Sequence, residues 1–167
     1  MTESTAEFSS RLWLMKNEPE ELSIQMLEAA PGRRAFWDGV RSYQARRMIR
    51  DDMQIGDRFL YYHSSCKPPG VAGIGVIDSE AEVDPAQFDP ANHYYDPKST
   101  TEKPLWLGRW VKHERTFRRF IPLHELREHT ERLGGNEFAL LRKANRLSVM
   151  PVTQYQFDFI VGLETAQ

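Results

Sequence analysis

Short strand patterns alternate with short helical patterns along the sequence, and this alternation restricts the fold more than any other feature. Five segments are expected to form strands: Arg11–Lys16, Arg58–His63, Val71–Val83, Leu105–Phe117 and Leu147–Val152. Helices are expected from Ser23 to Ala29, from Ser42 to about Asp51, after Pro122, from Glu137 to Lys143 and after Thr153. No glycine-rich phosphate loop follows the first strand, so a doubly wound sheet is disfavoured. We expect an α+β fold with a small, curved β-barrel of five to six strands, flanked by short helices.

Three local features refine this expectation. The first strand alternates so that Trp13 and Met15 face one side of the sheet and its leucines face the other. Gly73 and Gly75 interrupt a strand pattern, which indicates a bend or a close approach of another backbone. The stretch from Pro85 to Pro104 is the longest irregular segment, and loops of that length are usually functional or mobile.

The chain has 167 residues, which fits one domain. We expect a flexible tail over residues 1–10, a single domain over 11–162 and a C-terminal tail over 163–167. Cys66 is the single cysteine, so an internal disulfide and a cysteine-rich zinc site are excluded. The sequence shows no signal-peptide pattern and no apolar run that could span a membrane. We therefore expect a soluble intracellular monomer without cofactor or metal, cytoplasmic if bacterial and nuclear if eukaryotic.

Charge is segregated along the chain, although the formal net charge is only −2. The segment 31–50 has six arginines and one acid, and 103–120 has six basic residues and one acid, so each carries +5. The segment 78–102 has seven acids and one lysine, a local charge of −6. Two interpretations are open: separate solvated surfaces of opposite sign, or one positive face that binds nucleic acid if the fold brings the basic segments together.

Catalytic signals are weak. The sequence contains no metalloprotease, nucleophile-elbow or phosphate-loop motif. The run from His63 to Cys66 places a possible base beside hydroxyl and thiol groups, although such a run is more often a hydrogen-bonded turn. Glu18 and Asp38 are a possible carboxylate pair whose separation the sequence does not fix. An enzyme acting on a modified nucleobase or nucleotide through His63, Glu18 or Cys66 is therefore an alternative.

Trp37 lies beside an arginine-rich helix pattern. An exposed tryptophan there could stack a nucleobase while neighbouring arginines hold phosphates. The other interpretation is a buried residue that anchors the barrel. Stacking contributes about 1–3 kcal/mol per base, so phosphate contacts would have to supply much of the affinity.

Five strings carry a resemblance to a known family. They are WLMKNEP (Trp13–Pro19), WDGVRSYQAR (Trp37–Arg46), YYHSSCKPPGVAGIG (Tyr61–Gly75), the FDP and DPKS loop (Phe88–Ser99) and NRLSVMPVT (Asn145–Thr153). Together they resemble the EVE domain of the PUA-like superfamily, which is related to YTH domains. The resemblance implies a PUA-like barrel with a pocket for a modified nucleobase, and a DNA or RNA partner.

The resemblance also implies site residues. Those of the pocket and its rim are Lys16, Asn17, Glu18, Trp37, Ser42, Tyr43, Gln44, His63, Ser64, Ser65, Arg146 and Ser148. The family commonly has serine where Asn17 stands, and asparagine where Ser42 and Ser65 stand. The implied function is recognition without turnover: a modified base, a cytosine in DNA or a base in RNA, stacks on Trp37 while Arg41, Arg46 and Arg47 bind phosphates. A small-ligand or protein interaction module is the remaining alternative.

Overall fold

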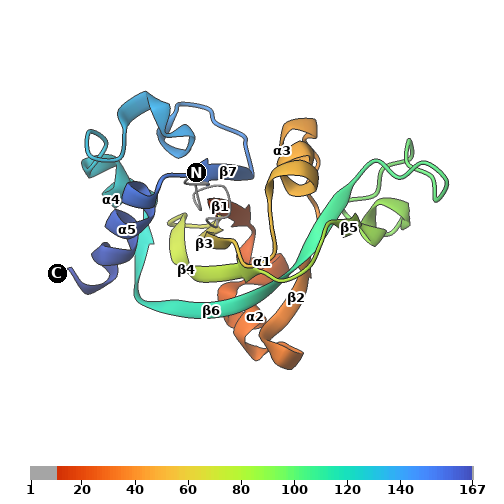
Figure 1. The fold of residues 1–167 in the computed structure, drawn as a ribbon, viewed down its shortest axis with the longest axis horizontal. Coiled ribbons are helices and arrows are strands. Elements are labelled where there is room, and N and C mark those ends of the chain that lie inside the picture. The colour runs from red at the N-terminus through yellow and green to blue at the C-terminus, as the bar shows by residue number, and fades with distance from the viewer. Residues whose placement is uncertain (1–10, 167) are drawn as a thin grey trace, which may run out of the picture.

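The computed structural model describes residues 11–166, and the tail expected over residues 1–10 lies outside them. Within these residues a sheet of seven strands runs in the order β2-β6-β4-β3-β1-β7, with β5 paired to β6 (Figure 1). The strands are β1 (Leu12–Asn17), β2 (Arg34–Trp37), β3 (Arg58–His63), β4 (Gly70–Ile77), β5 (Glu82–Val83), β6 (Leu107–Pro122) and β7 (Val149–Val152). All pairs are antiparallel except β1 with β3. The expected α+β fold with a curved sheet is confirmed, although the described strands do not close into a barrel.

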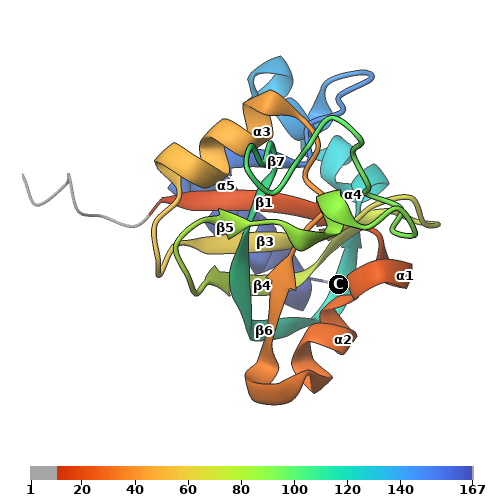
Figure 2. The ribbon, with the colours of Figure 1, turned by 90° about the vertical axis from the view of Figure 1, so that its right-hand side faces the viewer.

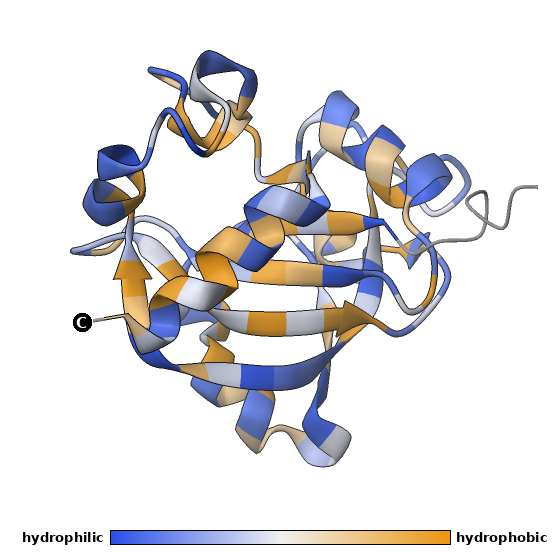
Figure 3. Ribbon diagram, turned by 60° about the vertical axis from the view of Figure 1, so that its left-hand side comes forward, coloured by the Kyte–Doolittle hydropathy of each residue, from blue (hydrophilic) through white to orange (hydrophobic). Residues whose placement is uncertain are grey.

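The sheet is buried on both faces because its strands alternate between two apolar clusters. Leu14 and Leu60 contribute to the cluster that α5 (Gln154–Gly162) covers. Figure 3 shows α5 lying across that face. Trp13 and Met15 contribute to the opposite cluster, as the alternation predicted.

Close packing of β4 requires its glycines. A Cβ atom at Gly73 would lie 2.2 Å from the Arg115 carbonyl oxygen, and one at Gly75 would lie 2.3 Å from the Phe59 ring. The register of β4 with β6 shifts between Ile74 and Gly75. The predicted bend and close approach are therefore confirmed, and they let the long strand β6 curve around the molecule (Figures 1 and 2).

The helices are short, as expected, and several begin at predicted caps. They are α1 (Pro19–Leu22), α2 (Ile24–Ala29), α3 (Tyr43–Arg47), α4 (Leu123–Glu128) and α5. The Ser23, Ser42 and Thr153 hydroxyls each accept a hydrogen bond from a backbone amide in the first turn. A π-helical turn over Met48–Asp52 continues α3 to the predicted end. In the described residues no helix is long and apolar enough to cross a membrane.

Four sequence-based expectations need correction. The strand expected over 71–83 divides into β4 and β5, and β2 was not expected. The helix expected over 137–143 is replaced by 3₁₀ turns at Gly135–Glu137 and Ala139–Leu141, because the preceding glycines have positive φ and Phe138 and Leu140 alternate into the core. The tail expected over 163–167 forms a 3₁₀ turn at Leu163–Thr165, and the buried Glu164 carboxylate pairs with Arg115 at 2.5 Å.

Candidate nucleic-acid interface

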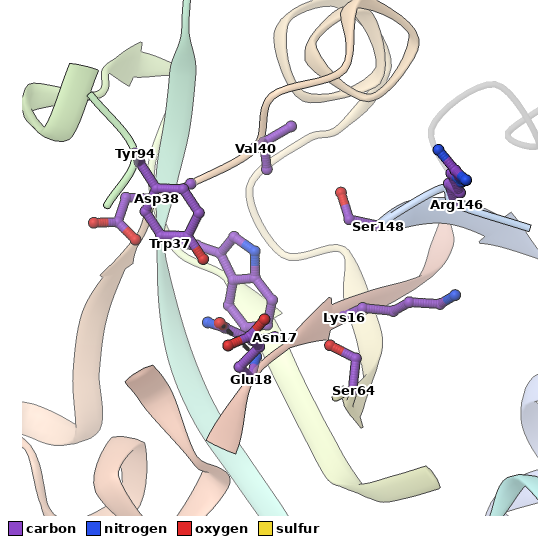
Figure 4. Close-up of a pocket in the computed structure, with 11 residues that line it drawn as sticks. Lys16, Asn17, Glu18, Trp37, Asp38, Val40, Ser64, Tyr94, Arg146 and Ser148 are labelled. Carbon is purple, nitrogen blue, oxygen red and sulfur yellow. Dashed lines mark hydrogen bonds between the residues drawn. The ribbon is translucent and has the colours of Figure 1, made fainter. Parts of the chain in front are cut away.

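A cavity of about 250 Å³ opens where several segments distant in sequence meet. These are the end of β1, the segment after β2, the loop after β3, the long loop after β5 and the segment before β7 (Figure 4). Its walls consist of Lys16, Asn17, Glu18, Trp37, Asp38, Gly39, Val40, Ser64, Tyr94, Arg146 and Ser148. The structure thus brings together seven of the residues that the resemblance assigned to the pocket.

Trp37 is both a core residue and part of the cavity wall. It is the last residue of β2 and only 1% exposed, with its ring edge-on to Phe59 at 5.5 Å and to Tyr61 at 5.1 Å between centroids. The Nε1–H of Trp37 has no hydrogen-bond partner among the described residues, and Figure 4 shows this edge on the side of the cavity lined by Val40 and Ser148. The interpretation of Trp37 as a buried anchor therefore fits its packing, while its indole edge remains available to a ligand.

Lys16 and Asn17 at the end of β1, and Glu18 directly after it, are held in place by hydrogen bonds. The Lys16 amide donates to the Ser148 carbonyl at 2.8 Å, and the Ser64 amide donates to the Asn17 carbonyl at 2.9 Å. The Asn17 side-chain oxygen accepts the Glu18 amide at 2.9 Å. Burial lowers the pKa of Lys16, whose ammonium group lies 5.4 Å from the Tyr62 ring centroid. These backbone bonds hold side chains from β1, the β3 loop and the segment before β7 around one space.

Tyr94 forms a wall that the sequence analysis missed. Its ring lies where a side chain at Gly39 would be, because a Cβ atom there would come within 2.6 Å of the ring. The Tyr94 hydroxyl donates to the Glu21 carboxylate. The backbone carbonyl of Tyr94 accepts hydrogen bonds from Arg41 Nε at 3.0 Å and Nη2 at 2.8 Å. The length of the loop over 85–104 was the available signal, and this loop supplies one wall of the site.

The cavity lining contains both acidic and basic side chains. Figure 4 shows Asp38 at the left and Lys16 and Arg146 at the right, with Glu18 beside Asn17 between them. Burial, with the neighbouring carboxylates of Asp84 and Glu21, raises the pKa of Asp38. Asp38 and Glu18 both line the cavity, which therefore offers hydrogen-bond acceptors as well as donors, and their action as a carboxylate pair stays a prediction.

Five residues that the resemblance assigned to the pocket and its rim do not line the cavity: Ser42, Tyr43, Gln44, His63 and Ser65. The Ser42 hydroxyl caps α3 by accepting the Ala45 amide at 3.1 Å, and its role in reading a base edge stays a prediction. Ser65 is exposed with φ of 54°, in the turn after β3. Tyr43 and Gln44 are exposed on α3.

His63 is buried and faces α2 rather than the cavity. Its Nε2 accepts the Ile24 amide at 3.1 Å, and burial lowers its pKa. Of the three residues considered for catalysis, only Glu18 lines the cavity. No group of three or more histidine, cysteine or acidic residues that could hold a metal occurs in the part of the chain that the structure describes.

The phosphate-binding role predicted for Arg41 and Arg46 is not supported by their contacts. Arg41 Nη1 pairs with the fully buried Asp84 carboxylate at 2.8 Å, and Arg46 Nη1 donates to the Leu105 carbonyl at 2.9 Å. Arg47 is exposed at the end of α3. Of the three arginines it is the most solvent-exposed one, and its role at a phosphate stays a prediction.

Part of the segregated charge is paired within the fold. Arg34 pairs with Asp78 at 2.6 Å, so two ion pairs join the basic segment 31–50 to the acidic segment 78–102. Arg109 is 2% exposed and donates to three backbone carbonyls. Several arginines of the basic segments therefore serve the fold, and a single positive face stays a prediction.

Comparisons with known proteins agree with this architecture. A model of the EVE domain matches residues 11–163. Thymocyte nuclear protein 1 of Danio rerio is 44% identical over 166 residues, covering 91% of this chain and 71% of that protein. The Homo sapiens protein is 42% identical over 165 residues, covering 91% and 73%.

Solved structures are also similar. A crystal structure of human THYN1 protein in complex with DNA containing 5-methylcytosine has a TM-score of 0.85 and 40% identity, covering 95% of this chain and 99% of that one. A Pseudomonas putida protein has a TM-score of 0.83 and 48% identity, covering 92% and 99%.

Proposed function

The chain belongs to the EVE domain family, and we propose that it binds DNA by holding a modified cytosine in the cavity beside Trp37. The observation that carries the proposal is the composition of this cavity, in which aromatic walls surround both hydrogen-bond donors and acceptors. The human relative whose structure contains 5-methylcytosine DNA supports the choice of ligand. Recognition would occur without chemical turnover.

The size of the cavity favours one base. Its volume of about 250 Å³ is below the roughly 300–1,000 Å³ of sites that bind drug-sized ligands. A base in a duplex would have to leave the stack, which costs a few kcal/mol. Contact with Trp37 and Tyr94 would offset part of this cost, and the apolar Val40 side chain offers a surface for a methyl group.

The charges of the cavity favour cytosine over thymine or uracil. Cytosine carries an exocyclic amino group, which carboxylates of aspartate and glutamate accept in protein–DNA complexes. Asp38 and Glu18 provide such acceptors in the cavity lining, while Lys16 and the hydroxyls of Ser64 and Ser148 can donate to the acceptor atoms of the base. Thymine and uracil lack the amino group and would leave these carboxylates without a donor.

Titration of matched oligonucleotides tests the proposal. Single-stranded and duplex DNA, and RNA, would be compared with 5-methylcytosine, cytosine or thymine at one position, at fixed low salt. We expect the tightest binding for 5-methylcytosine in DNA. Replacing Asp38 by Asn should weaken that binding roughly 5- to 150-fold, the range for loss of one good base contact. Glu20→Gln is the matched control, because it removes an exposed carboxylate in the first turn of α1 that does not line the cavity. This substitution should leave the affinity for 5-methylcytosine DNA unchanged.

Two results would contradict the proposal. One is the absence of measurable affinity for every modified oligonucleotide. The other is equal affinity for 5-methylcytosine, cytosine and thymine that Asp38→Asn does not alter. Tighter binding of a modified RNA would redirect the proposal to RNA, and formation of a product from the base would favour the enzyme alternative.

A further inference from the structure

Tyr43 is an exposed aromatic residue close to the cavity but outside it. It is 60% exposed and begins α3, three residues after Val40, which lines the cavity. Three residues of chain span at most about 11 Å. The Tyr43 ring is therefore within reach of a nucleotide adjacent to one whose base occupies the cavity.

The Tyr43 ring is held in place from one side. It stacks on Trp106 with 5.1 Å between centroids and 29° between planes. Trp106 is 5% exposed, and its Nε1–H donates to the Asp96 carboxylate at 2.8 Å. Because this fixed indole covers one face of Tyr43, the exposed part of the ring lies on the outer side. An aromatic ring that is already ordered loses little side-chain entropy when a ligand binds it.

Cationic groups accompany this ring. The Arg46 guanidinium lies 5.0 Å from the Tyr43 centroid and is bonded to the Leu105 carbonyl, beside Trp106. Arg47 is exposed and follows Tyr43 by four residues, a spacing that places two side chains on the same helix face. An exposed ring with a positive charge at its side is the combination that proteins use to bind single-stranded nucleic acid.

We propose that Tyr43 is a second stacking site, which receives the base next to the one held in the cavity, with Arg47 beside it at the phosphate backbone. The proposal rests on the proposed function of the cavity. When a base leaves a stack, its neighbour loses a stacking partner, and the outer face of Tyr43 replaces that partner. Base stacking on an aromatic side chain contributes about 1–3 kcal/mol by alanine substitution, equivalent to roughly 5- to 150-fold in affinity.

Single-stranded DNA with abasic positions tests the second stacking site directly. Three oligonucleotides would carry 5-methylcytosine with both neighbours present, with the 5′ neighbour abasic, or with the 3′ neighbour abasic. Single strands are used because an abasic position in a duplex would also make base extrusion easier. Tyr43→Ala should weaken binding of the complete strand roughly 5- to 150-fold, while Tyr43→Phe should retain most of the affinity. One of the two abasic strands should bind wild type more weakly and be insensitive to Tyr43→Ala.

The outcomes separate the two proposals. If Tyr43→Ala weakens the complete strand and both abasic strands by the same factor, or weakens none, the second stacking site is wrong while the cavity proposal stands. If wild type fails to prefer 5-methylcytosine in any strand, the cavity proposal fails and the stacking proposal fails with it. Unfolding curves provide the control for folding, because an exposed residue such as Tyr43 should change stability little.

Discussion

At the residue scale, Gly39 determines where Tyr94 can lie. Its φ is 82°, and an added Cβ atom would be 2.6 Å from the Tyr94 ring. We expect Gly39→Ala to move Tyr94 out of the cavity wall, to cost on the order of 1–3 kcal/mol of unfolding free energy, and to reduce affinity for 5-methylcytosine DNA at least several-fold. Denaturant unfolding and DNA titration would measure the two effects.

Gly56→Ala is a matched control for this prediction. Gly56 has a φ of 94° but nothing within 4 Å of the added atom, so it shares the backbone strain without the contact. We expect Gly56→Ala to reduce stability and to leave DNA affinity unchanged. Equal losses of affinity in both variants would show that strain, and not displacement of Tyr94, is responsible.

The buried His63 should make stability depend on pH. Its pKa is lowered by burial, so the folded state favours the neutral ring, whose Nε2 accepts the Ile24 amide. This contribution is complete above the ordinary histidine pKa of about 6.5 and is lost as pH falls from there toward the lowered value. We expect His63→Gln to flatten the fall of unfolding free energy below about pH 6.5. Chemical unfolding at several pH values would check this, and an unchanged slope would count against it.

His113 should also make the folded state less stable at low pH, so its effect has to be distinguished from that of His63. Burial also lowers the pKa of His113, and its Nδ1 has no partner among the described residues. The His63→Gln variant should therefore keep part of the pH dependence. A substitution to alanine at His63 is less informative, because the buried Ile24 amide would lose its acceptor at a cost of about 1–3 kcal/mol.

At the scale of helices and strands, the sequence predicted correctly those features that depend on residues close together in the chain. The caps at Ser23, Ser42 and Thr153 could be predicted because each hydroxyl bonds an amide within its own helix. Strand β2 could not, because its four residues are defined by pairing with β6 about 75 positions later in the chain. The same limit applied to the candidate site, since Tyr94 reaches the cavity through tertiary contacts that no local pattern records.

Gln87 fixes the long loop that carries Tyr94. It is fully buried, and its Nε2 donates to the carbonyls of Asp84 at 2.6 Å and Trp106 at 2.8 Å. Its Oε1 accepts the amides of Leu105 and Trp106, each at 2.9 Å. We expect Gln87→Ala to cost on the order of 2–4 kcal/mol, from four bonds of about 0.5–1.5 kcal/mol each with partial compensation by water.

Amide hydrogen exchange would test this role of Gln87. Exchange over residues 88–104 should accelerate more than exchange in β1 and β3. Gln154→Ala provides a control, because that glutamine is exposed and bonds only Asp158 within its own helix. Uniform acceleration across the sheet would mean that Gln87 stabilises the whole domain and not the loop in particular.

At the scale of the whole molecule, the sequence showed where the charged segments lie but not which charges are paired within the fold. Counting residues identified the basic segments, yet pairing decides which charges reach a ligand. Arg34 and Arg41 bind acids of the segment 78–102, and Arg109 binds backbone carbonyls. Arg47 is exposed at the end of α3. The fold therefore leaves fewer cations for phosphate than the local charge of +5 suggested.

Substitution of Arg41 should consequently lower stability, whereas substitution of Arg47 should change DNA binding and leave stability almost unchanged. Arg41→Gln removes the partner of the fully buried Asp84, and breaking a buried pair in this way costs about 3–5 kcal/mol. Arg47→Gln should change stability by less than about 0.5 kcal/mol, because it removes an exposed side chain. If Arg47 binds a phosphate, its loss should reduce the slope of log affinity against log salt by about 0.9 on duplex DNA. Unfolding curves and titrations at several salt concentrations measure both effects, and an unchanged salt slope for Arg47→Gln would remove it from the interface.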